Sequence, residues 1–342
     1  MKIICVEEHT VDTAIDRANH AAMMAEASYM ADVGIRVADG GEDRGDRPRL
    51  VPMKLALELA RDVGAGRLAD MDRHGIDMQV LSYSSVSQLA PAAQALDLTR
   101  AANDKLAEAA KAHPTRFGGF ATLPWQLPEA AAAELERAVK QLGLKGTLLM
   151  GRPGDTFLDD PRYAPVLAKL DELEVPIYVH PGAPLPQVQA PYYGGLEREV
   201  SARLSLFGWG WHNEAGIQVL RMMLSGVFER FPRLQVISGH WGEMVPFYLQ
   251  RLDDTIPQEA TGLSRSITDT YKAHVYVTPS GMLNLPHFTF IREVVGADRI
   301  LYSVDYPYVT NTGARAFLEG LPISQEDKEK IAHRNAEALF RL

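Results

Sequence analysis

The chain has 342 residues, of which 46% are hydrophobic and 23% are charged, the balance of a globular protein with a large core. Its formal net charge of −9 argues against non-specific nucleic-acid binding, because such binding depends on Lys and Arg neutralising phosphates. No apolar run approaches the roughly 20 residues that cross a bilayer, and the amino terminus lacks the basic head and long apolar stretch of a signal peptide. We therefore expect a cytoplasmic protein that binds neither nucleic acid nor membrane.

The single cysteine, Cys5, excludes an internal disulfide and fits a reducing compartment. It lies inside an apolar segment, where free cysteine usually behaves as a small buried hydrophobic residue. A nucleophilic role for Cys5 is the alternative.

Eight short apolar segments are predicted to form β-strands. Apolar residues are continuous in them instead of alternating with polar ones, which is typical of strands covered on both faces. In chain order the strands are residues 3–7, 78–82, 117–123, 146–150, 175–179, 234–238, 274–278 and 300–304.

Amphipathic segments separate most of these strands and are predicted to be helices. They are residues 95–112, 127–143, 161–174, 213–230, 243–256, 286–295 and 324–341. Alternating strands and helices predict parallel β–α units, and eight of them favour a closed (β/α)8 barrel, or TIM barrel, over an open doubly wound sheet. No linker-like composition divides the chain, so we predict one domain over residues 1–342.

Two connections are unusually long, residues 10–52 and 182–211, and both follow the carboxyl end of a predicted strand. The first contains the mixed-charge segment 42–49 (EDRGDRPR), which we expect to be a solvated loop. Long insertions without regular structure are usually lids or binding loops. We therefore expect two lids on the catalytic face of the barrel.

Residues that can bind a metal ion stand at the ends of the predicted strands. Glu7 and His9 end the first strand and share a direction, because residues i and i+2 of a strand point the same way. His180 ends the fifth strand and Asp305 the eighth. Two imidazoles and two carboxylates suit one zinc, manganese or iron ion, with positions left for water or substrate. A structural histidine, or a helix cap for the aspartate, is the alternative for each residue alone.

A second pair of polar residues follows the sixth strand. His240 ends that strand, and Glu243 stands three residues later in the first turn of the next predicted helix. Glu243 can orient the imidazole and fix its tautomer; complementing the helix dipole is its alternative role. The other histidines are predicted to be structural, namely His20, His74, His113, His212, His274, His287 and His333.

Seven motifs spread over nearly the whole chain carry a resemblance to a known family. They are VEEH at 6–9, RLADMDRHGIDMQVLS at 67–82, GGFATLPWQLPEAAAAELERAV at 118–139, LDDPRYAPVLAKLDELEVPIYVHP at 158–181, LSGVFERFPRLQVISGHWGEMVPFYLQRLD at 224–253, SVDYP at 303–307 and NAEALF at 335–340. On these motifs the chain resembles the amidohydrolase-related superfamily. Within it, the most similar branch contains aminocarboxymuconate-semialdehyde decarboxylase and the γ-resorcylate and 5-carboxyvanillate decarboxylases.

The resemblance implies one divalent metal ion, zinc or manganese, in a TIM barrel. The metal ligands of this branch match Glu7, His9, His180 and Asp305. Its catalytic pair matches His240 and Glu243.

Arg251 matches an arginine that, in relatives, reaches the substrate carboxylate of a neighbouring subunit. Relatives are dimers or tetramers, so the resemblance implies a homodimer or a homotetramer.

Three substrate-facing positions depart from the pattern of the hydroxybenzoate decarboxylases. Thr10 stands where those relatives usually have Phe, and Met150 stands near a position where they have Asn. After the seventh strand, the SGN of many relatives becomes SGM, beginning at Ser280. We predict that Thr10, Met150, Ser280 and Arg251 bind substrate. The two polar-to-Met changes predict a larger or more apolar pocket.

The resemblance implies metal-dependent, non-oxidative decarboxylation of a hydroxyaromatic or related unsaturated carboxylic acid. In this scheme the metal chelates the small-molecule substrate, Asp305 donates a proton to carbon, and His240 with Glu243 assists. An amide or lactone hydrolase that uses an activated metal-bound water is one alternative. A non-catalytic barrel that binds a ligand is another; loss of a ligand would be its mark, and none is missing.

Overall fold

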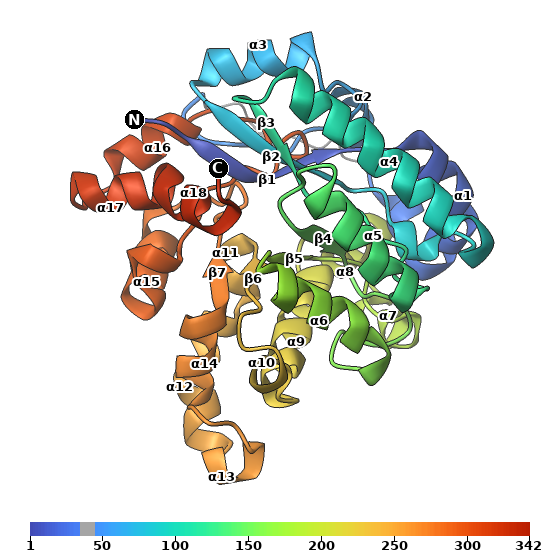
Figure 1. The fold of residues 1–342 in the computed structure, drawn as a ribbon, viewed down its shortest axis with the longest axis vertical. Coiled ribbons are helices and arrows are strands. Elements are labelled where there is room, and N and C mark those ends of the chain that lie inside the picture. The colour runs from blue at the N-terminus through green and yellow to red at the C-terminus, as the bar shows by residue number, and fades with distance from the viewer. Residues whose placement is uncertain (35–44) are drawn as a thin grey trace.

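Parallel strands form the centre of the protein, as the computed structural model shows (Figure 1). The structure describes residues 1–34 and 45–342. β1 (Ile4–Thr10), β2 (Met78–Tyr83) and β3 (Phe117–Gly119) form one sheet. The second sheet consists of β4 (Thr147–Met150), β5 (Ile177–His180), β6 (Val236–Ser238) and β7 (Val275–Val277). All neighbouring strands pair in parallel.

Single bridges join the two sheets into a ring. Ala121, just beyond β3, pairs with Thr147 of β4. Ile300 pairs with Val277 of β7 and Tyr302 pairs with Cys5 of β1, so residues 300–304 take the place of the eighth strand. The predicted (β/α)8 barrel is confirmed.

The eighth strand pairs less regularly than predicted, and a side chain binds the backbone where this strand ends. The carboxylate of Glu8 accepts hydrogen bonds from the backbone N–H groups of Val304, at 2.9 Å, and Tyr306, at 3.0 Å. The third strand is also shorter than the predicted 117–123, with only Ala121 pairing beyond β3.

Helices connect successive strands around the ring. Those that follow β2 to β7, in order, are α4 (Ala92–Ala112), α5 (Pro128–Lys140), α6 (Ala164–Leu173), α9 (Gly210–Leu224), α12 (Val245–Thr255) and α15 (Leu285–Val295). The predicted helix at 324–341 is α17 (Gln325–Glu329), a π-helical turn η5 (Lys330–Arg334) and α18 (Asn335–Phe340). Shorter helices are α3 (Ala65–His74), α10 (Val227–Arg230), α11 (His240–Glu243), α13 (Gln258–Thr261), α14 (Ile267–His274) and α16 (Ala314–Gly320). Three 3-10 turns are η2 (Ser87–Leu89), η3 (Pro161–Tyr163) and η4 (Ala297–Arg299).

The expectation of structureless insertions is wrong for the described parts of 10–52 and 182–211. The first contains α1 (Thr13–Glu26) and the turn η1 (Met30–Asp32), and α2 (Met53–Ala60) begins directly after it; the second contains α7 (Pro186–Tyr193) and α8 (Arg198–Ser205). Local signals explain two of these helices. The Asp12 carboxylate caps α1, and Pro186 occupies the first turn of α7, where a missing N–H costs nothing.

The mixed-charge segment 42–49 is only partly described. Residues 42–44 lie outside the described residues, and residues 45–49 form no helix or strand.

Two hydrophobic layers surround the strands. The inner layer consists of Ile4, Val6, Met78, Val80, Phe120, Leu148, Tyr178, Ile237 and Leu301, with Ala336 and Phe340 of α18. The larger layer lies between strands and helices and includes the fully buried Cys5. Burial raises the pKa of the Cys5 thiol, which disfavours the nucleophilic thiolate.

A β-bulge in β1 directs the polar end of this strand. Between Cys5 and Glu8 the register to β2 shifts, so that β1 has one residue more than its partner. Ile4 and Val6 point into the barrel, and a regular strand would place Glu8 on that same side. The extra residue instead brings Glu7 and His9 to the interior, and Glu8 is left to bind the eighth strand.

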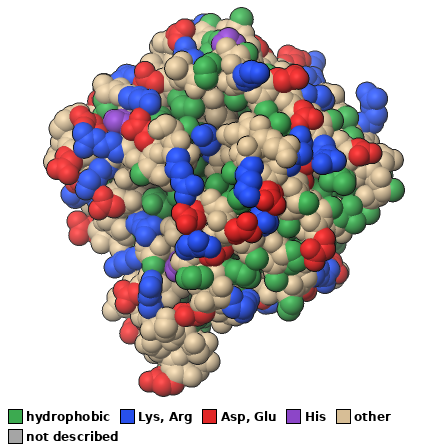
Figure 2. Space-filling view, in the orientation of Figure 1, with side chains coloured by type: hydrophobic (Ala, Val, Ile, Leu, Met, Phe, Trp, Pro, Cys, Tyr) green, Lys and Arg blue, Asp and Glu red, His purple; other side chains and the backbone are tan. Residues whose placement is uncertain are grey.

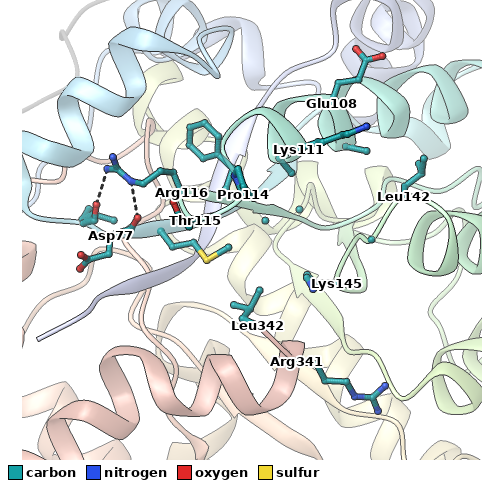
Figure 3. Close-up of a pocket in the computed structure, with 18 of the residues that line it drawn as sticks. Asp77, Glu108, Lys111, Pro114, Thr115, Arg116, Leu142, Lys145, Arg341 and Leu342 are labelled. Atoms are coloured by element: carbon teal, nitrogen blue, oxygen red, sulfur yellow. Dashed lines mark hydrogen bonds between the residues drawn. The ribbon is translucent and has the colours of Figure 1, made fainter.

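A cavity of about 1320 Å³ lies at the amino-terminal ends of β2, β3 and β4, where Met78 and Phe117 contribute to its wall. Lys145 lies in the same wall (Figure 3). In a (β/α)8 barrel this end serves stability, and active sites lie at the opposite end.

Acidic and basic side chains intermingle on the face of the molecule seen in Figure 2, without a continuous basic area there. Among the described residues, no helix has both the length and the apolar character of a membrane span.

Candidate metal centre

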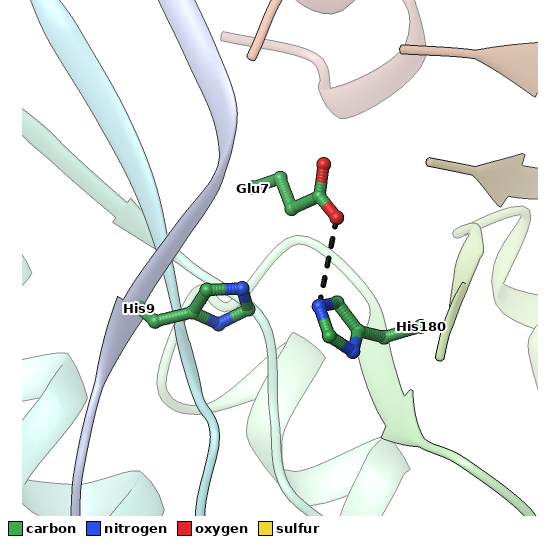
Figure 4. A group of neighbouring side chains, drawn as sticks. All are labelled: Glu7, His9 and His180. Carbon is green, nitrogen blue, oxygen red and sulfur yellow. Dashed lines mark ion pairs between the residues drawn. The ribbon is translucent and has the colours of Figure 1, made fainter. Parts of the chain in front are cut away.

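The carboxyl ends of β1 and β5 bring three side chains together (Figure 4). Glu7 and His9 of β1 approach His180 of β5, and one ligand atom from each lies within 4.8 Å of the other two. His180 Nε2 is 3.6 Å from Glu7 Oε1. All three side chains are buried. The predicted convergence of these residues is therefore present.

Hydroxyl groups hold one oxygen of Glu7. Ser303 Oγ donates to Glu7 Oε2 at 3.1 Å, Thr278 Oγ1 donates to it at 3.2 Å, and Ser280 Oγ forms a shorter hydrogen bond to the same atom. These three donors leave Glu7 Oε1 directed at the histidines.

Hydrogen bonds also orient the two imidazoles. His180 Nδ1 lies 2.9 Å from the Pro181 carbonyl oxygen, which can only accept, so Nδ1 carries the proton and Nε2 keeps its lone pair. His9 Nδ1 lies 3.1 Å from Ser82 Oγ, and its Nε2 faces the site. Partners of this kind fix the tautomer and ring plane of a histidine ligand.

Three buried ligand atoms have no hydrogen-bond partner within the described residues: Glu7 Oε1, His9 Nε2 and Asp305 Oδ1. Asp305 Oδ1 lies 3.1 Å from His9 Nε2, although it is outside the group of three that shares the 4.8 Å limit. Leaving a buried polar atom unsatisfied costs about 1–3 kcal/mol. Coordination of one divalent cation would satisfy all three atoms, and nitrogen and oxygen donors suit zinc or manganese. The residues present therefore fit such an ion.

Strained backbone is concentrated around this centre. His240, Ser280 and Asp305 have φ values of 45°, 47° and 70°, in the left-handed region that side chains other than glycine disfavour. Each follows a strand of the barrel. Strain of this kind is retained mainly at functional sites.

His240 and Glu243 form the predicted pair, and a third residue joins them. His240 Nδ1 lies 2.8 Å from Glu243 Oε1, and His212 Nδ1 lies 2.9 Å from Glu243 Oε2. The two imidazole centroids are 4.4 Å apart. The sequence predicts a structural role for His212, and its one distinguishing signal is its position at the end of the second long insertion, 182–211. The structure brings it to Glu243, 31 positions away in the chain.

The environment sets the charge of each group. Burial lowers the pKa of His180 well below its ordinary value, and His9 and His240 lower it further, so a neutral ligand is favoured. Burial raises the pKa of Glu7 more than the nearby histidines lower it. Burial disfavours charged His240, but the Glu243 carboxylate outweighs burial and raises the pKa of His240 to about 9.

A second cavity, about 790 Å³, opens onto these residues. His180, His240 and Asp305 line its polar part together with Tyr308. Met150, which we predicted to face substrate, also lines this cavity. A cavity of this size with a few convergent polar groups is typical of a small-molecule site.

Comparison with known proteins places this arrangement in a family. The family model described as Amidohydrolase matches residues 57–342. The chain belongs to the amidohydrolase family.

Several proteins to which this amidohydrolase is similar are named decarboxylases. Gamma-resorcylate decarboxylase from a Polaromonas species is 38% identical over 316 residues, which cover 87% of this chain and 94% of that protein. The crystal structure of 5-carboxyvanillate decarboxylase from Sphingomonas paucimobilis has a TM-score of 0.86 and 31% identity, over 100% of this chain and 99% of that one. A dihydroxybenzoic acid decarboxylase from Polaromonas was solved with bound manganese and the inhibitor 2-nitroresorcinol. It has a TM-score of 0.83 and 33% identity, over 100% of this chain and 97% of that one.

Three further residues that we expected this amidohydrolase to use for substrate lie outside the lining of the cavity. Thr10 is buried, and its hydroxyl donates to the Ala60 carbonyl at 2.8 Å. Ser280 is buried against Glu7. Arg251 is exposed on α12. None of the three is among the described residues that line the 790 Å³ cavity.

Proposed function

We propose that the protein is a metal-dependent, non-oxidative decarboxylase of a hydroxyaromatic or related unsaturated carboxylic acid. The observation that carries this proposal is the set of unpartnered buried ligand atoms beside the cavity lined by His240 and Asp305. The decarboxylases named above, which share the fold over nearly their whole length, support it.

We assign one divalent ion, manganese or zinc, to Glu7, His9, His180 and Asp305. When bound, such an ion neutralises and orients the substrate carboxylate together with an adjacent hydroxyl. Manganese in the related dihydroxybenzoic acid decarboxylase supports the first choice.

The residues around the ion divide the proton chemistry. Asp305 gives a proton to the ring carbon that bears the carboxylate; the carbon–carbon bond then breaks, its electron pair restores the aromatic ring, and CO2 leaves. His240, charged beside Glu243, holds a substrate oxygen. Met150 forms part of the cavity wall that contacts the aromatic ring of the substrate.

We propose that the whole of residues 1–342 is one catalytic unit and that it works as a homodimer or homotetramer in the cytoplasm. Arg251 supports the oligomer, because it is exposed and does not line the cavity of its own subunit. In an oligomer, its guanidinium is free to bind an anionic group in the partner subunit's site.

A substrate panel tests the reaction. Manganese-loaded protein is incubated with ortho-hydroxy aromatic acids, and CO2 release is followed in a coupled assay. We expect CO2 from at least one member, and Asp305→Asn should lower turnover by about 100-fold or more. Asp298→Asn, which changes an exposed carboxylate of η4, should leave turnover unchanged.

Two results would refute the decarboxylase. No CO2 release from any acid of the panel, together with metal-dependent hydrolysis of amides or lactones, would identify a hydrolase. Sub-stoichiometric, loosely held metal without either activity would favour a non-catalytic barrel.

A further inference from the structure

Two helices, α1 and α2, contribute to the wall of the 790 Å³ cavity, and each carries a polar residue near β1 and a methionine farther from it. α1 presents Asp16, His20 and Met23, which its helical repeat places on one face. α2 and the residue that ends it present Met53, Leu57 and Arg61, spaced four residues apart and again on one face.

The polar ends of both helices lie next to β1. The start of α1 follows β1 after two residues, and the backbone N–H of Asp12 fixes it further by donating to Ser85 Oγ, just beyond β2, at 2.8 Å. The end of α2 is held there because Thr10 Oγ1 donates to the Ala60 carbonyl at 2.8 Å. Both anchors are close to the end of β1 that carries His9.

The methionines lie farther from the metal centre. With a rise of about 1.5 Å per helical residue, Met23 is about 10 Å beyond Asp16, and Met53 is about 12 Å beyond Arg61. The cavity therefore passes from a polar end at the metal ligands to the methionines on the outer parts of α1 and α2, where the charge of Glu26, which ends α1 and also lines the cavity, is paired with Arg152.

The apolar end consists of partly exposed side chains. Met23, Met30, Met53 and Leu57 line it and are only half-buried. Apolar surface gains free energy when it is removed from water, so an apolar ligand group is the occupant that this end favours. The volume also exceeds the need of one aromatic ring and lies in the range typical of drug-sized ligands.

We infer, on the basis of the proposed function, that the substrate is an ortho-hydroxy aromatic acid with an alkyl substituent of several carbon atoms. Its carboxylate and hydroxyl lie at the metal centre, and its alkyl chain lies against Met23, Met53 and Leu57. Each buried methylene should raise kcat/KM about fourfold until the chain fills the apolar end.

A chain-length series tests this inference. The substrates are 2,4-dihydroxybenzoic acids with hydrogen, methyl, propyl or pentyl at position 6, given to the manganese-loaded protein. We expect kcat/KM to rise about fourfold per methylene. The dissociation constants of the corresponding 5-alkylresorcinol products, measured by calorimetry, should fall by the same factor.

Matched variants on α2 show where the alkyl group of the substrate binds. Leu57→Asn should flatten the dependence on chain length and leave turnover of the unsubstituted acid within about twofold. Leu55→Asn is the control, because Leu55 is on the same helix but is 46% exposed and does not line the cavity. If Leu57→Asn does not fold, Met53→Asn provides the same test.

The outcomes separate the two proposals. A flat or falling kcat/KM along the series, with turnover of the unsubstituted acid, overturns the inference and leaves the proposed function standing. Equal responses of the Leu57 and Leu55 variants also overturn it. If no member of the series releases CO2 but another acid of the wider panel does, the inference is overturned and the proposed function stands. If the wider panel releases no CO2 either, both are refuted.

Discussion

At the scale of single residues, the hydroxyls around Glu7 decide which of its oxygens is left for a metal ion. Ser280, Ser303 and Thr278 occupy Oε2, and Oε1 remains without a partner among the described residues. A hydrogen bond that orients a ligand typically changes metal affinity by 10-fold to 100-fold.

Ser280→Ala should therefore weaken manganese binding by about 10-fold to 100-fold, because Glu7 loses one of its three donors. Metal affinity is measured by competition with a chelator. Ser84→Ala is the control, since Ser84 lines the cavity but bonds to Tyr308 and not to a ligand. Unchanged metal affinity with a raised KM would instead place Ser280 against the substrate.

Glu243 gives the fold a pH dependence through His240. The pKa of His240 is raised to about 9, so its ion pair contributes fully below the ordinary value of 6.5 and is lost as pH rises through 9. The lowered pKa of Glu243 keeps the pair intact down to its ordinary value of 4.5.

Glu243→Gln should therefore abolish the loss of unfolding free energy between pH 6.5 and pH 9.5 that wild type shows. Urea unfolding at several pH values, with saturating metal, measures it. Glu172→Gln, at an exposed carboxylate of α6, should keep the wild-type profile. Parallel profiles for all three proteins would contradict the assignment.

At the scale of elements, one buried arginine ties two helices to the end of β4. Arg152 Nη1 lies 2.7 Å from Glu214 Oε2 on α9, and Nη2 pairs with Glu26 at the end of α1. The same guanidinium donates to the Ala183 carbonyl at 2.8 Å. Arg152 thereby fixes the outer end of α1, part of the apolar wall of the cavity.

Arg152→Met should cost about 3–5 kcal/mol of unfolding free energy, because it leaves the two partly buried carboxylates without their cation. Urea unfolding measures the loss. Arg162→Met serves as the control, because Arg162 is exposed and solvent screens its pairs with Asp155 and Asp160, so its loss should change the unfolding free energy little. Equal losses in the two variants would contradict this role.

At the scale of the whole molecule, an exposed aromatic patch points to self-association. Phe247 is 70% exposed and Tyr248 is 54% exposed on α12, and Phe290 of α15 packs beside Phe247. Arg251 is exposed on the same helix α12. Contiguous exposed apolar side chains are typical of protein interfaces.

Phe247→Asp should convert a wild-type oligomer into monomers, because a charge would be buried at the centre of the patch. Size-exclusion chromatography with light scattering gives the mass. Tyr192→Asp, at a residue 66% exposed outside the patch, should remain oligomeric. A monomeric wild type would rule out the oligomer itself.

The sequence by itself determined the barrel and three residues, Glu7, His9 and His180, that the structure brings together at the candidate metal centre. Continuous apolar segments and amphipathic repeats are local properties, so strands and most large helices could be predicted within a few residues. Glu7, His9 and His180 could be selected because parallel strands bring their carboxyl ends to one face. The helices that were missed are α1, α2, α3, α7, α8, α13, α14 and α16. Most of them are short, and short helices depend more on packing than on intrinsic preference.

Only the tertiary structure decided which side chains support that centre. The contact of Ser280 with Glu7 spans 273 positions, and that of His212 with Glu243 spans 31, and no local pattern encodes either. The bulge in β1 and the order of polar and apolar residues along the cavity also emerge only when the barrel closes. Hydrophobic periodicity specifies an element, but contacts between elements exist only after the chain has folded.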